Sequence, residues 1–368
     1  MKRILPLLFV LPISAYGVAC QSNSGDDETE TPGGPAGGDG AGGDNGGGGD
    51  GNGPTDEELS ANPIEGIAPA KAVMESGQFT DGPVWHAQLG VLFFSTPLGE
   101  GSIYRMLPDG RAMKVRDGSR AEGTTPIGNT VNAAGELVTV HMKMITRTPL
   151  GDKGQPLEPV VVASGYDPNA PPPPPPDGEE APPPIASTGQ FDTLNDVVAR
   201  KDGTLYVTDP GYFAEPTANR IYRIAPDGVV QVVEAFEDVP RPNGIALSPD
   251  ESTLYVGFSA PIQGTLPFIR QYIVNEDGTL GEWTKFADVG PEDSVPDGLA
   301  VDVAGNVYVA SKAGIEVYKN DGTKIGVAPV PEKPTGITFG GKDMKSLFIT
   351  TEGVKIWELR VNVPGISQ

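Results

Sequence analysis

The chain has 368 residues, a formal net charge of -23 at pH 7, two histidines and one cysteine. Its acidic balance argues against nucleic acid or an anionic lipid surface as a partner. Two histidines are too few for a histidine-rich metal site, and a single cysteine excludes internal disulfides and a zinc site made of cysteines.

The N-terminal residues 1–20 are typical of a secretory signal peptide. Lys2 and Arg3 precede an apolar run that ends at Cys20, and this run is too short to span a bilayer as a mature helix. Residues 17–19, Gly-Val-Ala, resemble the box that lipoprotein signal peptidase cleaves, with glycine where leucine is usual. We predict an exported lipoprotein of the cell envelope, on the periplasmic side of the outer membrane or on the cell surface, whose lipids on Cys20 make its only membrane contact. An ordinary signal peptide is the alternative.

The next segment, residues 21–62, has the composition of a linker. It contains glycine runs and scattered acids but no Lys or Arg. Such a sequence cannot bury enough apolar surface to fold, so we predict a disordered tether with a root-mean-square reach of roughly 35 Å. The remaining residues, 63–368, are long enough for one domain, which we expect to be monomeric.

Residues 63–368 predict an all-β domain, because short Val, Ile, Tyr and Phe runs alternate with Asp-Gly and Asn-Gly turns. One unit, two apolar runs around a turn, recurs six times, starting at Asp81, Ile127, Leu194, Pro242, Pro296 and Pro334. Repeats of about 40 to 55 residues with four strands each predict a six-bladed β-propeller, with four-stranded antiparallel blades around a central channel. The last repeat is one strand short, and we expect residues 70–75 to supply it. A sandwich would not repeat one hairpin in this way.

A proline-rich segment at about residues 166–190 interrupts the repeats. It includes six consecutive prolines, and proline lacks the amide hydrogen that a strand ladder requires. We predict an insertion in the loop between two blades.

Four oxygen-bearing residues occupy the same position in different repeats: Asp81 in TDGPVW, Asn195 in LNDVV, Asn243 in PNGIA and Asp297 in PDGLAV. In a propeller the first strand of each blade lines the channel, so these residues are expected to surround one mouth of it. Two carboxylates and two amide oxygens suit Ca²⁺, Mg²⁺ or Mn²⁺. The alternative is that each Asp-Gly or Asn-Gly pair only forms a turn.

Other catalytic chemistries find little support. The chain has no Gly-x-Ser-x-Gly nucleophile motif. We expect His86 to be solvated at a turn and His141 to pack as a strand residue.

The segments TDGPVW, LNDVVARKDGTLYVTDPGYF, RPNGIALSPDESTLYVGF and VPDGLAVDVAGNVYVAS resemble bacterial gluconolactonases of the SMP-30/gluconolactonase/LRE-like family. The resemblance runs from about residue 79 to 365, without the proline-rich insertion. It implies a six-bladed propeller with one divalent cation at the channel mouth, most often Ca²⁺, with Mg²⁺, Mn²⁺ or Zn²⁺ as further possibilities. It also implies hydrolysis of a sugar lactone, the reaction of many members.

By motif match, the metal-binding Glu, Asn and Asp of the family fall on Asp81, Asn243 and Asp297. The substrate-side Asn of the family, which sometimes lies near the metal too, falls on Asn195. The chain departs from the family at Asp81, which is one methylene shorter than Glu. It departs again at Thr193, where some members have a substrate-contacting Arg.

The resemblance predicts that the cation polarises the lactone carbonyl and that Asp297 is both ligand and general base. Asp196, Asp209 and Tyr212, which follow Asn195, are expected to line the substrate pocket, although Asp-Pro-Gly at 209–211 is also a plain turn.

Two alternatives to a lactonase remain open. One is a binding propeller without turnover, which the changes at Asp81 and Thr193 favour. The other is a hydrolase of different esters or phosphoesters at the same site. The second repeat also differs from relatives, since residues 127–129 read Ile-Gly-Asn where Asn-Gly-Leu is common.

Overall fold

The computed structural model describes residues 54–167, 189–212, 218–237, 240–259 and 266–366. The predicted signal peptide, most of the predicted tether and most of the proline-rich insertion lie outside these residues. Within the described residues, no helix has the length and apolar character needed to cross a membrane.

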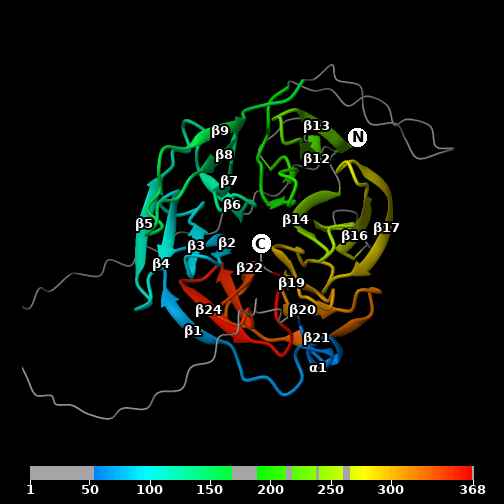
Figure 1. The fold of residues 1–368 in the computed structure, drawn as a ribbon. Coiled ribbons are helices and arrows are strands. Elements are labelled where there is room, and N and C mark those ends of the chain that lie inside the picture. Colours follow the sequence, from blue (N-terminus) through cyan, green and yellow to red (C-terminus); the bar gives the residue numbers. More distant parts are fainter. Residues whose placement is uncertain (1–53, 168–188, 213–217, 238–239, 260–265, 367–368) are drawn as a thin grey trace, which may run out of the picture. The chain divides into compact units, whose positions relative to one another are not determined.

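Six four-stranded antiparallel sheets make up the described fold, which confirms the predicted six-bladed β-propeller (Figure 1). The first strands of the blades are β2 (Asp81–His86), β6 (Pro126–Val131), β10 (Val197–Ala199), β14 (Arg241–Leu247), β18 (Leu299–Val301) and β22 (Pro334–Gly340). The second strands are β3 (Val91–Ser95), β7 (Leu137–His141), β11 (Leu205–Asp209), β15 (Thr253–Ser259), β19 (Val307–Ser311) and β23 (Ser346–Thr351). The third strands are β4 (Ser102–Met106), β8 (Ile145–Thr148), β12 (Ala218–Ile224), β16 (Phe268–Val274), β20 (Gly314–Tyr318) and β24 (Lys355–Arg360). The fourth strands are β5 (Ala112–Asp117), β9 (Val160–Ala163), β13 (Val230–Glu237), β17 (Leu280–Asp288), β21 (Lys324–Ala328) and β1 (Lys71–Glu75).

The blades close into a ring through their first strands. Each first strand contacts the first strand of the next blade, and β22 of the last blade contacts β2 of the first. The sixth blade takes its outer strand from upstream of the first, since β1 pairs antiparallel with β24. The predicted closure by residues 70–75 is therefore confirmed.

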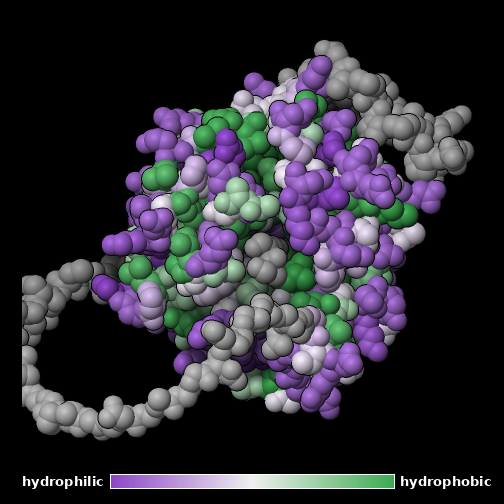
Figure 2. Space-filling model, in the orientation of Figure 1, coloured by the Kyte–Doolittle hydropathy of each residue, from purple (hydrophilic) through white to green (hydrophobic). Residues whose placement is uncertain are grey.

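The core lies between neighbouring blades. Every residue of the second strands β7, β11, β19 and β23 is buried, because each blade is covered by a blade on either face. In one such interface Tyr206 and Val198 of the third blade pack in the same cluster as Ile245 and Val256 of the fourth. On the face drawn in Figure 2, hydrophilic residues cover much of the outer surface, as expected for an acidic chain.

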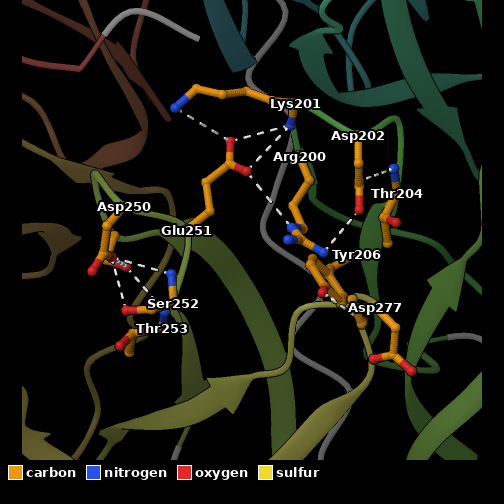
Figure 3. Close-up of polar contacts among 12 residues, drawn as sticks. Arg200, Lys201, Asp202, Thr204, Tyr206, Asp250, Glu251, Ser252, Thr253 and Asp277 are labelled. Carbon is orange, nitrogen blue, oxygen red and sulfur yellow. Dashed lines mark hydrogen bonds and ion pairs between the residues drawn. The ribbon is translucent and has the colours of Figure 1, made fainter.

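Polar contacts join the third and fourth blades at the end of the channel where the first strands finish (Figure 3). Glu251, in the turn between β14 and β15, accepts a hydrogen bond from the backbone nitrogen of Lys201 at 3.1 Å. Its carboxylate also lies 3.6 Å from Nε of Arg200. The hydroxyl of Tyr206 donates to the carbonyl of Gly278 at 2.7 Å. These contacts fix the relative position of the two blades that supply Asn195 and Asn243.

At the opposite end, glycine allows the first strands to approach one another closely. The second position of the repeated motif is Gly82, Gly128, Gly244, Gly298 and Gly336 in five blades. A Cβ on Gly82 would lie 2.1 Å from the carbonyl oxygen of Ile127, and one on Gly244 would lie 1.8 Å from that of Asp297. No side chain fits at such distances, so glycine is required there. The third blade has Asp196 at this position.

The described residues begin at 54, before residue 63, the predicted start of the propeller. Residues 54–62 contain the short helix α1 (Asp56–Ser60), in which Thr55 and Glu58 form a capping box. Glu58 also pairs with Lys345 at 2.7 Å. The glycine-rich composition of the preceding residues concealed this local helix signal.

Candidate functional site

The structure brings the four residues predicted to surround the metal to one pocket at the channel mouth. Asp81, Asn195, Asn243 and Asp297 line it, each from a different blade. Asn195 and Asp297 precede β10 and β18, where their backbone nitrogens donate to the second strands at 2.9 Å in both cases. The pocket measures about 30 Å³, which is room for about one or two waters or a single ion.

One buried oxygen atom in this pocket, Oδ1 of Asn243, lacks a hydrogen-bond donor among the described residues. Asn243 is 3% exposed and its Oδ1 has no partner within the described residues. Asp81 Oδ1 accepts a hydrogen bond from the backbone nitrogen of Gly82 at 2.8 Å. A buried acceptor without a donor is costly, and a bound cation would remove that cost. The donor set therefore fits a hard divalent cation.

A third carboxylate, Asp196, lines the same pocket. Its Oδ1 accepts from the backbone nitrogen of Val197 at 2.9 Å, and its Oδ2 accepts from that of Ile245 in the fourth blade at 3.2 Å. Asp196 therefore connects the first strands of two blades while it adds negative charge to the mouth.

Burial raises the pKa values of all three carboxylates. Desolvation raises the pKa of Asp196 to about 7, and the negative charge of Asp81 adds to the effect. The pKa of Asp81 is raised by desolvation, and that of Asp297 is raised by desolvation and then by Asp81. In the described residues, no three Asp, Glu, His or Cys side chains converge as a metal-binding group. A cation here would therefore need the amide oxygens as well as the carboxylates.

Asn129 of the second blade holds the neighbouring segment of the first. Its Nδ2 donates to the carbonyl of Gly82 at 2.7 Å and to Oγ of Ser95 at 2.8 Å, and its Oδ1 accepts from Thr139 at 2.7 Å. Since Gly82 directly follows Asp81, these bonds fix the backbone that carries the first carboxylate. The role of Asn129 was not predicted. One sequence feature could have indicated it. The four ring residues stand at the first position of the repeated motif, whereas the polar residue of the second repeat, Asn129, stands at the third.

Asp209 does not reach the pocket, contrary to its predicted contact with substrate. It is fully buried at the end of β11, where its carboxylate accepts from the backbone nitrogens of Asp192 at 2.8 Å and Thr193 at 2.7 Å. The carboxylate is thus used to hold the loop that leads to Asn195. Asp209 is a positioning residue.

Tyr212 stands at the rim of the pocket and is 39% exposed. Its hydroxyl oxygen accepts a hydrogen bond from Nδ2 of Asn243 at 3.1 Å, and the guanidinium of Arg241 lies 5.7 Å from its ring centre. Thr193 is buried, and its hydroxyl has no partner in the described part of the chain.

Neither histidine lines the pocket. His86 is 4% exposed and its Nε2 lies 3.0 Å from the carbonyl oxygen of Gly135 in the next blade, so the prediction of a solvated His86 is wrong. His141 is a buried strand residue, as expected, between the carbonyl of Thr124 and the hydroxyl of Thr146. Desolvation lowers the pKa of His141 to about 4, so the ring is neutral at neutral pH.

The fold and the pocket together define a six-bladed β-propeller with carboxylate and amide oxygens gathered at one mouth of its channel. The chain belongs to the SMP-30/gluconolactonase/LRE-like family, since the family model matches residues 79–353. The predicted family resemblance is confirmed.

Individual relatives are similar over part of the chain. A gluconolactonase of Zymomonas mobilis is 31% identical over 177 residues, which cover 44% of this chain and 48% of the relative. The pentonolactonase XacC of Haloferax volcanii is 33% identical over 164 residues, 43% of this chain and 53% of the relative. The chain thus spans about half the length of these curated relatives. A solved gluconolactonase from Xanthomonas campestris is 25% identical, covers 81% of this chain and 99% of its own, and has a TM-score of 0.61.

Proposed function

We propose that this protein is a lactone hydrolase that uses the pocket at the channel mouth. The observation that carries the proposal is the convergence of Asp81, Asn195, Asn243 and Asp297 in one pocket. These residues share a repeat position, and Asn195, Asn243 and Asp297 match the family motifs, whereas Asp81 replaces the Glu of the family. The similar proteins named gluconolactonase and pentonolactonase support a sugar lactone as the substrate.

Asp81, Asn243 and Asp297 would hold one divalent cation, with Asn195 beside it. Calcium is the ion we propose, because Ca²⁺ accepts carboxylate and amide oxygens in flexible geometry. A divalent cation at this position would polarise the lactone carbonyl and stabilise the charge that develops on its oxygen.

The side chains of the pocket have separate roles in this proposal. Asp297 accepts the proton of the attacking water, since its carboxylate has no hydrogen-bond donor among the described residues and desolvation raises the pKa of this carboxyl well above its ordinary value. Asn195 orients the lactone. Asn129 and Asp209 keep the segments of Asp81 and Asn195 in place through the bonds described above.

The test is a panel of aldonolactones incubated with the full chain, before and after treatment with a chelator. We expect ring opening that the chelator abolishes and that added Ca²⁺ restores. Asp297→Ala should lose both turnover and stoichiometric cation binding. If no lactone of the panel shows chelator-sensitive turnover, the proposal is wrong.

A binding propeller without turnover is the second candidate, and Thr193 favours it. The side chain of Thr193 has no positive charge with which to bind sugar hydroxyls, and its own hydroxyl is buried. Calorimetric binding of a lactone without ring opening would identify this case. The remaining alternative is a hydrolase of different esters or phosphoesters, and such substrates are included in the same panel to test it.

Export and lipid anchoring at Cys20 are also proposed, since they rest on residues 1–20, outside the described residues. Detergent extraction of cell fractions tests the anchor. We expect the wild type in the membrane fraction and Cys20→Ala released from it. Size-exclusion chromatography of the released protein tests the proposed monomer.

A further inference from the structure

Arg241 places an uncommitted positive charge beside the pocket. It is the first residue of β14, two positions before Asn243. Its guanidinium lies 5.7 Å from the ring centre of Tyr212, whose hydroxyl contacts Asn243. Arg241 is not one of the residues that line the pocket, and its guanidinium lies next to Tyr212.

No ion pair involves Arg241 in the part of the chain that the structure describes. Other basic side chains near the mouth are already used. Lys333, close enough to Asp297 to oppose the rise of its pKa, pairs with Glu352. Lys143 donates to the carbonyl of Phe191 at 2.9 Å. Arg241 is therefore the basic group of the described rim that remains available to a ligand.

The proposed cation ligands line the pocket, so the lactone carbonyl is placed there and the rest of the substrate extends towards the rim. Tyr212 is 39% exposed at that rim, and the guanidinium of Arg241 lies 5.7 Å from its ring centre. The five donors of Arg241 match the two oxygens of a carboxylate.

We propose that Arg241, supported by Tyr212, is a specificity-determining residue that binds an anionic group on the substrate, remote from the lactone carbonyl. This inference rests on the proposed lactone hydrolysis and adds a substrate class to it, namely lactones of sugar acids with a second acidic group.

The experiment compares the 1,4-lactones of galactonic acid and galactaric acid, which differ only in a hydroxymethyl or a carboxylate at C6. The variants are Arg241→Gln, Arg241→Lys and the control Arg111→Gln, which removes an exposed arginine paired with Asp109. For the carboxylate-bearing lactone, we expect Arg241→Gln to raise KM about tenfold or more with little change in kcat, the loss of one charge-assisted contact. KM for the neutral lactone should be unchanged, and Arg241→Lys should be intermediate.

Two results would overturn the inference. One is a wild type that does not prefer the carboxylate-bearing lactone, and the other is an Arg241→Gln variant that affects both lactones equally. If the wild type opens neither lactone, the proposed function fails separately, and both lactones are then titrated as ligands by calorimetry. Tighter binding of the carboxylate-bearing lactone that requires Arg241 would support the role of this residue, and equal affinities would refute it.

Discussion

The side-chain amide nitrogen of Asn243 donates to the hydroxyl oxygen of Tyr212 at 3.1 Å. With its nitrogen held at the rim, Asn243 directs Oδ1 into the interior, where this atom is buried and has no partner in the described residues. Tyr212 thus selects the rotamer in which the amide presents oxygen to the pocket. A residue predicted to touch substrate also positions a proposed cation ligand.

Tyr212→Phe should weaken Ca²⁺ binding about three- to tenfold, because the amide of Asn243 loses the hydrogen bond that orients it, a bond of about 1 kcal/mol. The free energy of unfolding should change little, since Tyr212 is 39% exposed. Isothermal titration with Ca²⁺ and urea unfolding provide the two measurements. Tyr104→Phe, which removes an exposed hydroxyl bonded to Glu100, is the matched control. Unaltered Ca²⁺ affinity in Tyr212→Phe would show that Asn243 needs no such support.

Asp297→Asn should separate cation binding from fold stability. The ionised carboxylate is disfavoured in the folded protein by desolvation and by Asp81. Neutral Asn should therefore raise the melting temperature of the chelator-treated protein at pH 8. The same variant should lose the rise in melting temperature that Ca²⁺ gives the wild type. Differential scanning calorimetry with and without Ca²⁺ measures both effects, and a destabilised cation-free variant would contradict the proposed crowding of charge.

The apparent affinity for Ca²⁺ should fall as the solution is acidified below pH 7. The folded pKa of Asp196 is about 7, above its ordinary value of 3.8, and those of Asp81 and Asp297 are raised as well. Because the cation binds the ionised forms, each proton that it displaces should cost about tenfold in affinity per pH unit. Calorimetric titrations at pH 5, 6, 7 and 8 would measure this slope.

The cation-free protein should show the opposite dependence. Between about pH 4 and 7 the folded state retains protons on these carboxylates that the unfolded state has released. The contribution of these groups to stability is therefore present at low pH and is lost as the pH rises towards 7. Urea unfolding of the chelator-treated wild type and of Asp297→Asn would measure the contribution of these carboxylates to stability. An identical pH dependence of stability in the two proteins would contradict this contribution.

Asn129→Ala should destabilise the protein by about 1–3 kcal/mol, the cost of leaving buried polar groups unpartnered. It removes bonds to Gly82, Ser95 and Thr139. It should also weaken Ca²⁺ binding, since the backbone next to Asp81 loses its support. Asn275→Ala in an exposed turn, where Asn275 bonds Thr279, serves as the control and should leave Ca²⁺ affinity unchanged. A stable Asn129→Ala variant with full affinity would exclude this positioning role.

The propeller and the four ring residues could be predicted because they depend on repetition. Each of the four ring residues lies at or next to the start of a first strand, and the closed ring brings equivalent positions together regardless of their distance in the chain. The glycine after Asn243 or Asp297 is part of the same signal, because the strands approach too closely for another residue.

The other features depend on partners that no local pattern reveals. Asp209 looked like a pocket residue, but nearby backbone amides bind its carboxylate. The sequence predicted that His86 is solvated at a turn, but its ring is buried and contacts the carbonyl of Gly135 in another blade. Asn129 stands outside the repeat position, so its bond to Gly82 appears only when the two blades are assembled.

Gly244→Ala tests whether the close approach of first strands sets the geometry of the pocket. The new Cβ would lie 1.8 Å from the carbonyl oxygen of Asp297, so the segment that carries this carboxylate must move. We expect a loss of about 1–3 kcal/mol in the free energy of unfolding, typical of overpacking, and a larger proportional loss of Ca²⁺ affinity and lactone turnover.

Gly281→Ala is the matched control for this variant. Gly281 lies in β17, and the nearest atom to its added Cβ, in Ile273, is at 3.4 Å, an ordinary contact. This variant should keep Ca²⁺ affinity and turnover, with stability unchanged or raised by up to about 1 kcal/mol, because alanine restricts the unfolded chain. Equal effects of the two substitutions on Ca²⁺ affinity would mean that any added methyl group disturbs the propeller. A selective loss in Gly244→Ala would instead tie cation binding to the contact between the fourth and fifth blades.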